Sequence, residues 1–344
     1  MGLATPVSLM AGSNAAARRG ILIRDGLALE RAGEIGAIVF DKTGTLTKGK
    51  PSVAAFENFS SAPLPSNELA ASLARASNHP LSKAVAKTTS ANVELRNWRE
   101  LRGAGVEAEI NGAKARLGSM AHLQRSGVDT TPAAKFLEDW TSRGATVLGL
   151  SINREIVAAI ALQDAIDSQS ATVVRQLRRS GLKVYLITGD NPLTAKAIAK
   201  QAGIAQENVF AQVRPEEKAK LVKHLQGNGE RVAFVGDGIN DAPALEQADL
   251  GIAVSQASDV ANEAADIILL KSEISGVVEA LNLARATLRT IKQNLFWAFF
   301  YNAAAVPLAA LGFLSPVLCA AAMGLSDLVV IGNALRLARF SGQK

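Results

Sequence analysis

The stretch that decides the fold is GAIVFDKTGTLTKGKP, residues 36–51. Its apolar run, 36–40, is typical of a buried strand, and the carboxylate of Asp41 follows directly. Because ligands of open parallel sheets bind beyond the carboxyl ends of the strands, we expect Asp41 to lie beside an anionic ligand. A carboxylate at that place can attack a phosphoryl group and form an acyl phosphate. Thr43 and Gly44 would let the backbone turn and present N–H groups to phosphate oxygens.

The sheet that contains this strand is predicted from a repeating strand, turn and helix pattern that begins near residue 160. Strand-like runs at 183–187, 208–213, 231–235 and 250–254 each precede a turn and a helical pattern. This alternation predicts an open parallel sheet with covering helices. Between the first strand and this repeat, polar turns and strand-like pairs indicate an α+β insertion that interrupts one α/β domain.

The ends of the other strands supply groups that suit phosphoryl transfer. Asp237 and Asp241, after the strand at 231–235, are hard oxygen ligands of the kind that Mg²⁺ prefers. The Thr188 hydroxyl could bind a phosphoryl oxygen, and Lys218 could offset charge on the transferred group. Each alone is weak, because GDG is an ordinary turn and a helical lysine is usually solvated. Together, on successive strand ends of one sheet, they indicate one active site.

Thr43 also discriminates between reactions. A phosphatase built on this plan benefits from a second carboxylate two residues after the nucleophile, which protonates the leaving group and then activates water. The threonine hydroxyl cannot protonate the leaving group or activate water in this way. We therefore expect the acyl phosphate on Asp41 to persist long enough to be coupled to another process.

Hydrophobicity is concentrated near the C-terminus. Residues 294–314 carry no charge, and 316–335 are interrupted only by Asp327, so both runs are long enough to span a bilayer. Basic residues stand before and after the pair, but the turn between the two runs has none (the residues are Arg289, Lys292, Arg336, Arg339 and Lys344). The positive-inside rule then places both ends in the cytoplasm. The alternative is a buried helical hairpin of a soluble protein.

Composition excludes several other classes. The net charge is +6, yet no basic stretch is interleaved with aromatic residues, so the excess indicates anionic ligands and a membrane face and not nucleic acid. The single cysteine, Cys319, excludes a disulfide framework and a multi-cysteine zinc cluster within this chain. The polar opening segment does not have the apolar core of a secretory signal.

The motifs DKTGTLT (41–47), TGDN (188–191) and GDGINDAPAL (236–245) together resemble P-type ATPases, ion pumps whose catalytic domain has the haloacid dehalogenase fold. NHPL (78–81), GAGVEA (103–108) and GLATP (2–6) are similar to signatures of the heavy-metal, or type IB, class. The resemblance implies a Rossmann-type α/β phosphorylation domain with an inserted α+β nucleotide-binding domain and a C-terminal transmembrane hairpin. The implied domains are 1–20, the end of a membrane helix and its cytosolic extension; 21–52 and 160–276, the phosphorylation domain; 53–159, the nucleotide-binding domain; and 285–344, the membrane helix pair.

The resemblance also implies that ATP phosphorylates Asp41 with the help of Mg²⁺. Catalytic roles fall on Asp41, Lys42, Thr43, Thr188, Gly189, Asp190 and Lys218; nucleotide binding falls on His79, Pro80, Gly103, Gly105 and Gly118; and Mg²⁺ binding falls on Asp41, Thr43, Asp237 and Asp241. Ala74, Asn78 and Ser119 depart from the glutamates and the asparagine that the family often has there. These departures imply fewer contacts to adenine.

The choice of transported ion is taken from the two apolar runs. Tyr301, Asn302, Met323 and Ser326 resemble the copper(I) pattern of the last two helices, and a thioether is a soft ligand suited to Cu⁺. Asp327 stands where copper pumps usually carry a second serine. A carboxylate suits zinc, cadmium or cobalt better, so a pump of those metals is the alternative.

The resemblance implies a multi-pass protein of a bacterial inner or plasma membrane with cytoplasmic catalytic domains. Its partners would be the lipid bilayer, ATP, a heavy-metal ion and the N-terminal part of the pump, with its actuator domain, metal-binding cysteines and earlier helices. The chain alone is then expected to bind nucleotide and become phosphorylated but not to transport. A membrane-anchored phosphatase of the same fold and a regulatory fragment that pairs with another chain are the competing hypotheses.

Overall fold

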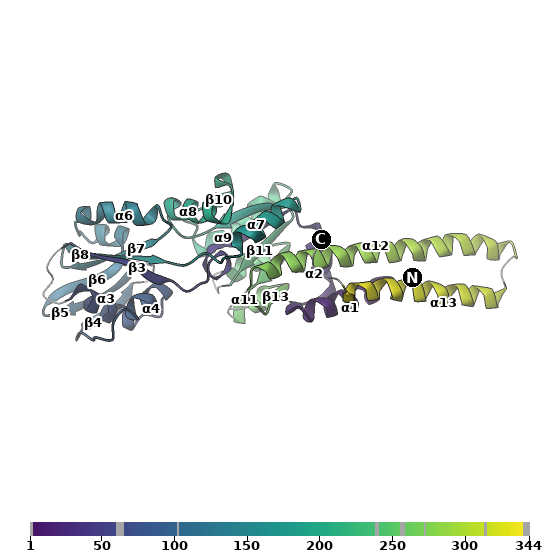
Figure 1. Ribbon diagram of the computed structural model, residues 1–344, viewed down its shortest axis with the longest axis horizontal. Helices are drawn as coiled ribbons and strands as arrows, with labels where there is room; N and C mark the ends of the chain where they lie inside the picture. Colours follow the sequence, from purple (N-terminus) through teal and green to yellow (C-terminus); the bar gives the residue numbers. More distant parts are fainter. Residues whose placement is uncertain are drawn as a thin grey trace. The chain divides into compact units, whose positions relative to one another are not determined.

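The computed structural model describes residues 3–59, 65–101, 103–237, 241–254, 259–271, 273–312 and 315–339 (Figure 1). The chain divides into two compact units. The first consists of Met1–Asp41, Gln169–Tyr185 and Arg214–Lys344, and the second of Lys42–Ser168 and Leu186–Val213. The peptide bond between Asp41 and Lys42 is therefore one of the points where the chain passes from one unit to the other.

A seven-stranded sheet carries the strands expected of the phosphorylation domain. Its order is β1 (Ile21–Ile23), β13 (Ile267–Leu269), β12 (Leu250–Ala253), β11 (Val232–Gly236), β2 (Ala37–Asp41), β9 (Lys183–Ile187) and β10 (Val209–Phe210). The pairings of β2 with β11, of β11 with β12, of β12 with β13 and of β9 with β10 are parallel, and β1 joins β13 antiparallel. Every residue of β2 and β11 is buried, as the continuous apolar runs of a two-sided parallel sheet require.

The strand expected at 208–213 is shorter in the structure. It ends at Phe210, and Gln212 adopts a positive φ of 56°, which lies outside the extended region of a regular strand. The backbone of this segment instead binds the loop after β9: Gln212 N–H donates to the Asp190 carbonyl (2.8 Å) and Val213 N–H to the Thr188 carbonyl (3.1 Å). After Phe210 the chain therefore continues as a loop that is hydrogen-bonded to the loop after β9.

The helices of the first unit cover this sheet and extend beyond it. They are α1 (Ala4–Ala17), α2 (Gly26–Glu34), α7 (Ser170–Arg179), α9 (Pro215–Gly227), α10 (Ala242–Gln247), α11 (Asp259–Ala264), α12 (Ser275–Ala310) and α13 (Pro316–Leu335). Helices α9 and α10 pack on β11, and α2 packs on both β12 and α12. The largest fully buried side chains of this unit, Phe40 and Phe234, lie on neighbouring central strands.

The inserted sheet is antiparallel throughout. Its order is β3 (Ser52–Asn58), β8 (Glu155–Gln163), β7 (Thr146–Ile152), β6 (Ala113–Ser119), β5 (Gly105–Ile110) and β4 (Arg96–Leu101). Alternate residues of β7 and β8 enter two different cores. One core contains α3 (Ser66–Arg75) and α4 (Pro80–Ala86), and the other contains α5 (Met120–Arg125) and α6 (Ala134–Thr141), so helices cover both faces.

The two apolar runs form the hairpin of α12 and α13, which contact each other and α1. Asn294 is fully buried and holds the three helices together, because it donates to Ser8 Oγ (2.9 Å) and to the Val330 carbonyl (3.3 Å). Within the described residues, length and composition single out one helix able to cross a membrane, Ala320–Ala338, with a mean hydropathy of 1.3. The first predicted span, 294–314, extends beyond the described residues, and its described part, in α12 up to Ala310, is not singled out by the same criterion.

The pairing of β5 with β6 generates a stability prediction. Gly105 faces Gly118, and a Cβ at Gly105 would lie 2.2 Å from the Leu117 carbonyl oxygen. We expect Gly105→Ala to lower the free energy of unfolding by about 3 kcal/mol, because two strand backbones would have to separate. Gly112→Ala is the control: it also has a positive φ but meets open space, so its cost should be about 1 kcal/mol. Urea unfolding followed by tryptophan fluorescence measures both, and equal losses would contradict the packing argument.

Candidate functional site

Three carboxylates meet at one edge of the seven-stranded sheet. Asp41 ends β2, Asp237 follows the adjacent parallel strand β11, and Asp241 directly precedes α10. One oxygen of each lies within 4.8 Å of the others. Asp41 and Asp241 are only 6% and 2% exposed. A Cβ on Gly236 would lie 2.8 Å from Asp241 Oδ2, so the last position of β11 must be small for this carboxylate to approach.

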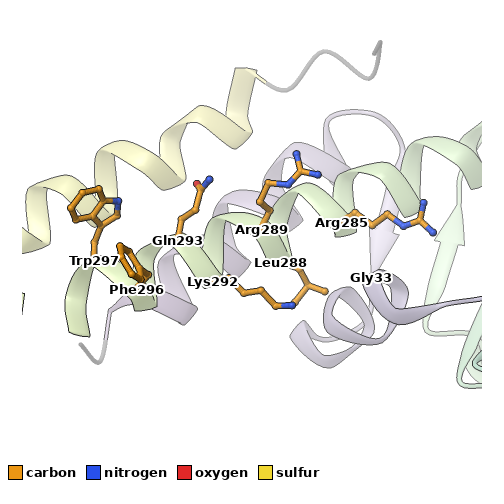
Figure 2. Close-up of a pocket in the computed structure, with 8 residues that line it drawn as sticks. All are labelled: Gly33, Arg285, Leu288, Arg289, Lys292, Gln293, Phe296 and Trp297. Carbon is orange, nitrogen blue, oxygen red and sulfur yellow. The ribbon is translucent and has the colours of Figure 1, made fainter. Parts of the chain in front are cut away.

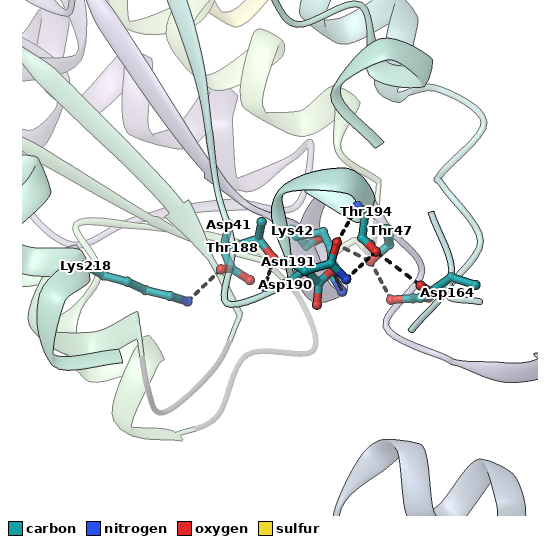
Figure 3. A network of polar contacts seen from close by, with 10 residues as sticks. Asp41, Lys42, Thr47, Asp164, Thr188, Asp190, Asn191, Thr194 and Lys218 are labelled. Carbon is teal, nitrogen blue, oxygen red and sulfur yellow. Dashed lines mark hydrogen bonds and ion pairs between the residues drawn. The ribbon is translucent and has the colours of Figure 1, made fainter. Parts of the chain in front are cut away.

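Lys218, from α9, holds two of these carboxylates together. Its Nζ donates to Oδ1 of Asp41 at 2.6 Å (Figure 3). It also donates to Oδ1 of Asp241 at 2.6 Å. Burial disfavours the charged ammonium, but the two carboxylates outweigh this effect and raise the pKa of Lys218 above its usual value. Lys218 is therefore a permanent cation inside the site and not the solvated lysine that is usual on a helix.

Asp237 has a different charge state. Burial, together with repulsion from Asp41 and Asp241, raises its pKa to about 7, and Lys218 opposes this only in part. If all three acids were ionised, the cluster with Lys218 would carry two net negative charges. An oxygen-only donor set with uncompensated negative charge fits a hard divalent cation such as Mg²⁺.

The loop after Asp41 makes the turn that its sequence indicates. In the segment Lys42–Leu46, Gly44 has a φ of 71° and Thr43 is exposed. Thr47 closes the loop: its hydroxyl contacts the Lys42 carbonyl (3.0 Å) and an oxygen of Asp164. Asp164 also accepts from the Lys50 N–H (3.1 Å). Neither Thr47 nor Asp164 was assigned a role from sequence, although Asp164 does follow a strand, β8.

A second polar cluster lies on the TGDN segment, within the second unit. Lys42 donates from Nζ to Oδ2 of Asp190 at 2.8 Å, and both side chains are largely buried (Figure 3). Thr188 is 2% exposed, its Oγ1 accepts from the Asp190 N–H (3.1 Å), and Gly189 is exposed between them. Asn191 caps α8 (Pro192–Ala202) by accepting from two N–H groups of its first turn.

The residues predicted to bind nucleotide lie at one edge of the inserted sheet. Gly105 and Gly118 are paired, and the backbones approach closely because neither has a side chain. His79 caps α4, and its N–H donates to Ser77 Oγ (3.1 Å), which in turn donates to Glu100 (2.8 Å) on β4 beside β5. Gly103 precedes β5 with a φ of 72°, and Pro80 is the first residue of α4.

His79 is neutral at physiological pH. Desolvation lowers the pKa of its ring although part of the residue is exposed, and nearby Glu100 opposes this shift without overcoming it. Nδ1 accepts from the Leu81 N–H (3.3 Å), so the proton of the neutral ring is on Nε2. No sequence motif indicated Ser77 and Glu100, which hold the histidine in place.

The residues predicted to bind the transported ion are divided between the two hairpin helices. Tyr301 and Asn302 are on α12, and Met323, Ser326 and Asp327 are on α13. The Tyr301 ring contacts Trp297 and Phe300, Asn302 donates to the Ala298 carbonyl (2.7 Å), and Met323 is 71% exposed. In the described part of the chain, none of the five donates a hydrogen bond to another, so their role stays a prediction.

A family model of the haloacid dehalogenase-like hydrolases matches residues 35–249, and a second matches 218–281. Because the first match covers more than half of the chain, the protein belongs to this family, and the predicted fold class is confirmed.

Relatives and solved structures narrow the likeness to heavy-metal P-type ATPases, as the motifs indicated. The chain is 43% identical to "Probable copper-transporting ATPase PacS" of Synechococcus elongatus, over 99% of this chain and 47% of that protein. It is 42% identical to "Copper-exporting P-type ATPase" of Bacillus subtilis, over 98% and 42%. A "zinc-transporting PIB-type ATPase" structure has a TM-score of 0.76 and 35% identity, covering 98% of this chain and 55% of that one. The chain thus spans about half the length of these relatives.

The raised pKa of Asp237 predicts how pH alters metal binding. The folded state holds this proton more tightly than the unfolded state, so its contribution to stability is lost as pH rises through about 7. A bound Mg²⁺ must displace the same proton, and we therefore expect Mg²⁺ to raise the unfolding temperature more at pH 8 than at pH 6. Differential scanning fluorimetry measures this, with Asp237→Asn as the variant that should abolish the difference. An equal Mg²⁺ effect at both pH values in the parent would contradict the assignment.

Proposed function

We propose that this chain is the catalytic and C-terminal membrane portion of an ATP-driven heavy-metal pump that forms an aspartyl phosphate on Asp41. The observation that carries the proposal is the buried Asp41 carboxylate with Asp237, Asp241 and Lys218 converging on it. The family match and the copper- and zinc-transporting relatives support the coupling of this chemistry to transport.

The proposed reaction is a single phosphoryl transfer. A carboxylate oxygen of Asp41 attacks the γ-phosphorus of ATP, the bond to the oxygen that bridges the β- and γ-phosphates breaks, and ADP leaves. Lys218 offsets negative charge on the transferred group. Asp41, Thr43, Asp237 and Asp241 would hold Mg²⁺, which would neutralise phosphate charge. Thr188, Gly189, Asp190 and Lys42 would bind and position the phosphate.

The inserted sheet would bind the nucleotide. The paired glycines Gly105 and Gly118 leave a backbone surface without side chains, on which a planar base can lie closely. The neutral His79 ring offers an apolar face and an N–H donor, and Gly103 and Pro80 shape the loops beside it. Backbone and stacking contacts of this kind would hold adenine without the glutamates and asparagine that Ala74, Asn78 and Ser119 replace.

A phosphatase of the same fold is the second candidate, because the family is one of hydrolases. Its mechanism needs an acid or base two residues after the nucleophile, and that position holds the exposed Thr43. We therefore propose the pump, because this chain has no acid or base at position 43 to hydrolyse the acyl phosphate rapidly. Completion of the cycle would need the N-terminal part that the longer relatives possess.

We propose Cu⁺ as the transported ion and a bacterial inner or plasma membrane as the location, with the catalytic units cytoplasmic. The thioether of Met323 is the soft donor that favours Cu⁺, and the copper-transporting relatives support this choice. Asp327 and the zinc-transporting structure favour the alternative, a harder divalent ion.

Phosphorylation can be tested on this chain directly. Incubation with γ-labelled ATP and Mg²⁺ should give an acid-stable, hydroxylamine-labile label that Asp41→Asn abolishes. Lys218→Met should slow labelling by about 10²-fold, because a cation aimed at the transferred group is lost. Lys220→Met, an exposed lysine on the same helix, is the matched control and should label at the parental rate. A label that persists in Asp41→Asn, or release of phosphate from simple phosphoesters without ATP, would refute the pump mechanism.

The choice of metal can be tested by competition with chromophoric chelators for the chain in detergent. We expect Met323→Leu to weaken Cu⁺ binding by about tenfold, since an apolar side chain of similar size replaces the soft donor. Met10→Leu, a similarly exposed methionine on α1, should bind Cu⁺ as the parent does. Tighter binding of Zn²⁺ than of Cu⁺ that is lost in Asp327→Asn would assign the chain to the zinc class.

A further inference from the structure

A hollow of about 510 Å³ lies between α2 and the middle of α12, outside the phosphorylation site (Figure 2). Three of the residues that line it are cations, Arg285, Arg289 and Lys292, and two are aromatic, Phe296 and Trp297. The floor depends on a close approach of the two helices. Leu288 packs on Gly33 so tightly that a Cβ there would lie 2.0 Å from a Leu288 methyl.

The spacing of these residues places them along one face of a continuous helix. Positions 285, 289, 292 and 296 are separated by four, three and four residues, the spacing of side chains that neighbour each other along a helix. The cations occupy the end of the hollow nearer the sheet, and the aromatic pair occupies the end nearer the apolar hairpin (Figure 2). Lys292 and Phe296 are separated along the axis by about 6 Å, at 1.5 Å per residue.

The cations of the hollow are not compensated by acids. In the described part of the chain, Arg285, Arg289 and Lys292 make no ion pair with a carboxylate, and no acidic residue lines the hollow. Elsewhere in the same unit, Lys218 and Arg231 are each paired with aspartate. A single exposed cation is ordinarily solvated, but three on one face of a hollow form a receptor for an anion.

The aromatic end identifies the kind of anion. Phe296 and Trp297 are 61% and 43% exposed, next to further exposed apolar residues of α12 such as Phe299 and Phe300. Aromatic side chains concentrate at the boundary between head groups and hydrocarbon, and basic residues on the cytoplasmic side attract anionic lipids. The head-group layer is about 6 Å deep, which matches the step from Lys292 to Phe296. A soluble phosphate compound would not account for the apolar half.

We propose that this hollow binds one anionic phospholipid. Its phosphate would lie among Arg285, Arg289 and Lys292, and the part of its acyl chains next to the head group would lie along Phe296 and Trp297. The site rests on the proposed membrane insertion of α12 and α13. A lipid held there would contact both α12 and α2, and α2 packs on β12 of the phosphorylation sheet.

Trp297 can report the occupant. The chain has three tryptophans, so Trp98→Phe with Trp140→Phe leaves Trp297 as the sole reporter. In vesicles of phosphatidylcholine, brominated phosphatidylglycerol should quench its fluorescence at about a tenfold lower mole fraction than brominated phosphatidylcholine. The triple variant Arg285→Gln, Arg289→Gln, Lys292→Gln should lose this preference. Retained labelling of Asp41 by ATP would show that the triple variant is folded.

The control is Arg336→Gln, which should keep the preference. Arg336 lies near the same level, because it contacts Asn333, whose amide donates to Gln293 on α12, but it does not line the hollow. The lipid site would be overturned if both brominated lipids quenched Trp297 equally, or if the preference for phosphatidylglycerol survived in the triple variant. It would also be overturned if Arg336→Gln lost that preference to the same extent as the triple variant, or if inorganic phosphate displaced the lipid. Quenching by neither lipid would contradict membrane insertion itself, and the site with it, but not the phosphorylation of Asp41.

Discussion

The ammonium of Lys218 between Asp41 and Asp241 is the interaction on which the carboxylate cluster at the sheet edge depends. Two ionised carboxylates about 4 Å apart repel each other by about 4 kcal/mol at the effective dielectric of a protein surface, and burial increases the cost. Three acids within 4.8 Å are therefore tolerable only with a cation among them. Lys218 supplies one positive charge. The raised pKa of Asp237 indicates that this single charge does not offset the repulsion and burial that the third carboxylate experiences. The cluster thus keeps uncompensated negative charge, which fits a divalent cation.

The position of that cluster follows from the sheet. β2 and β11 are parallel neighbours, so their last residues end at one edge, and Gly236 leaves the space that Asp241 enters from α10. The loop after Asp41 is closed separately, by the Thr47 hydroxyl and Asp164. The carboxylate cluster includes Asp41, and the loop starts at the next residue, Lys42. Asp41 belongs to one unit and Lys42 to the other. The proposed covalent change at Asp41 would therefore occur where the chain passes between its two units.

The first unit also contains the apolar hairpin, which a buried asparagine holds together. Asn294 is buried among α1, α12 and α13, where its amide satisfies a hydroxyl and a carbonyl that water cannot reach. On the opposite side of the same helix lies the basic and aromatic hollow against α2. The hairpin and the proposed lipid site thus share one continuous helix, α12, which also packs on α2.

The sequence by itself determined the parallel sheet, the inserted α+β sheet and the acids at the strand ends, because burial periodicity and strand-end positions are local properties. It overestimated the strand at 208–213, since the positive φ of Gln212 accompanies hydrogen bonds to the loop after β9. Only the tertiary structure decided that Lys218 bridges two acids, that Asp164 and Glu100 support the predicted loops, and that Gly33 admits Leu288 to form the hollow. These features join residues that are far apart in the chain, and a local sequence pattern does not indicate which distant residues come into contact.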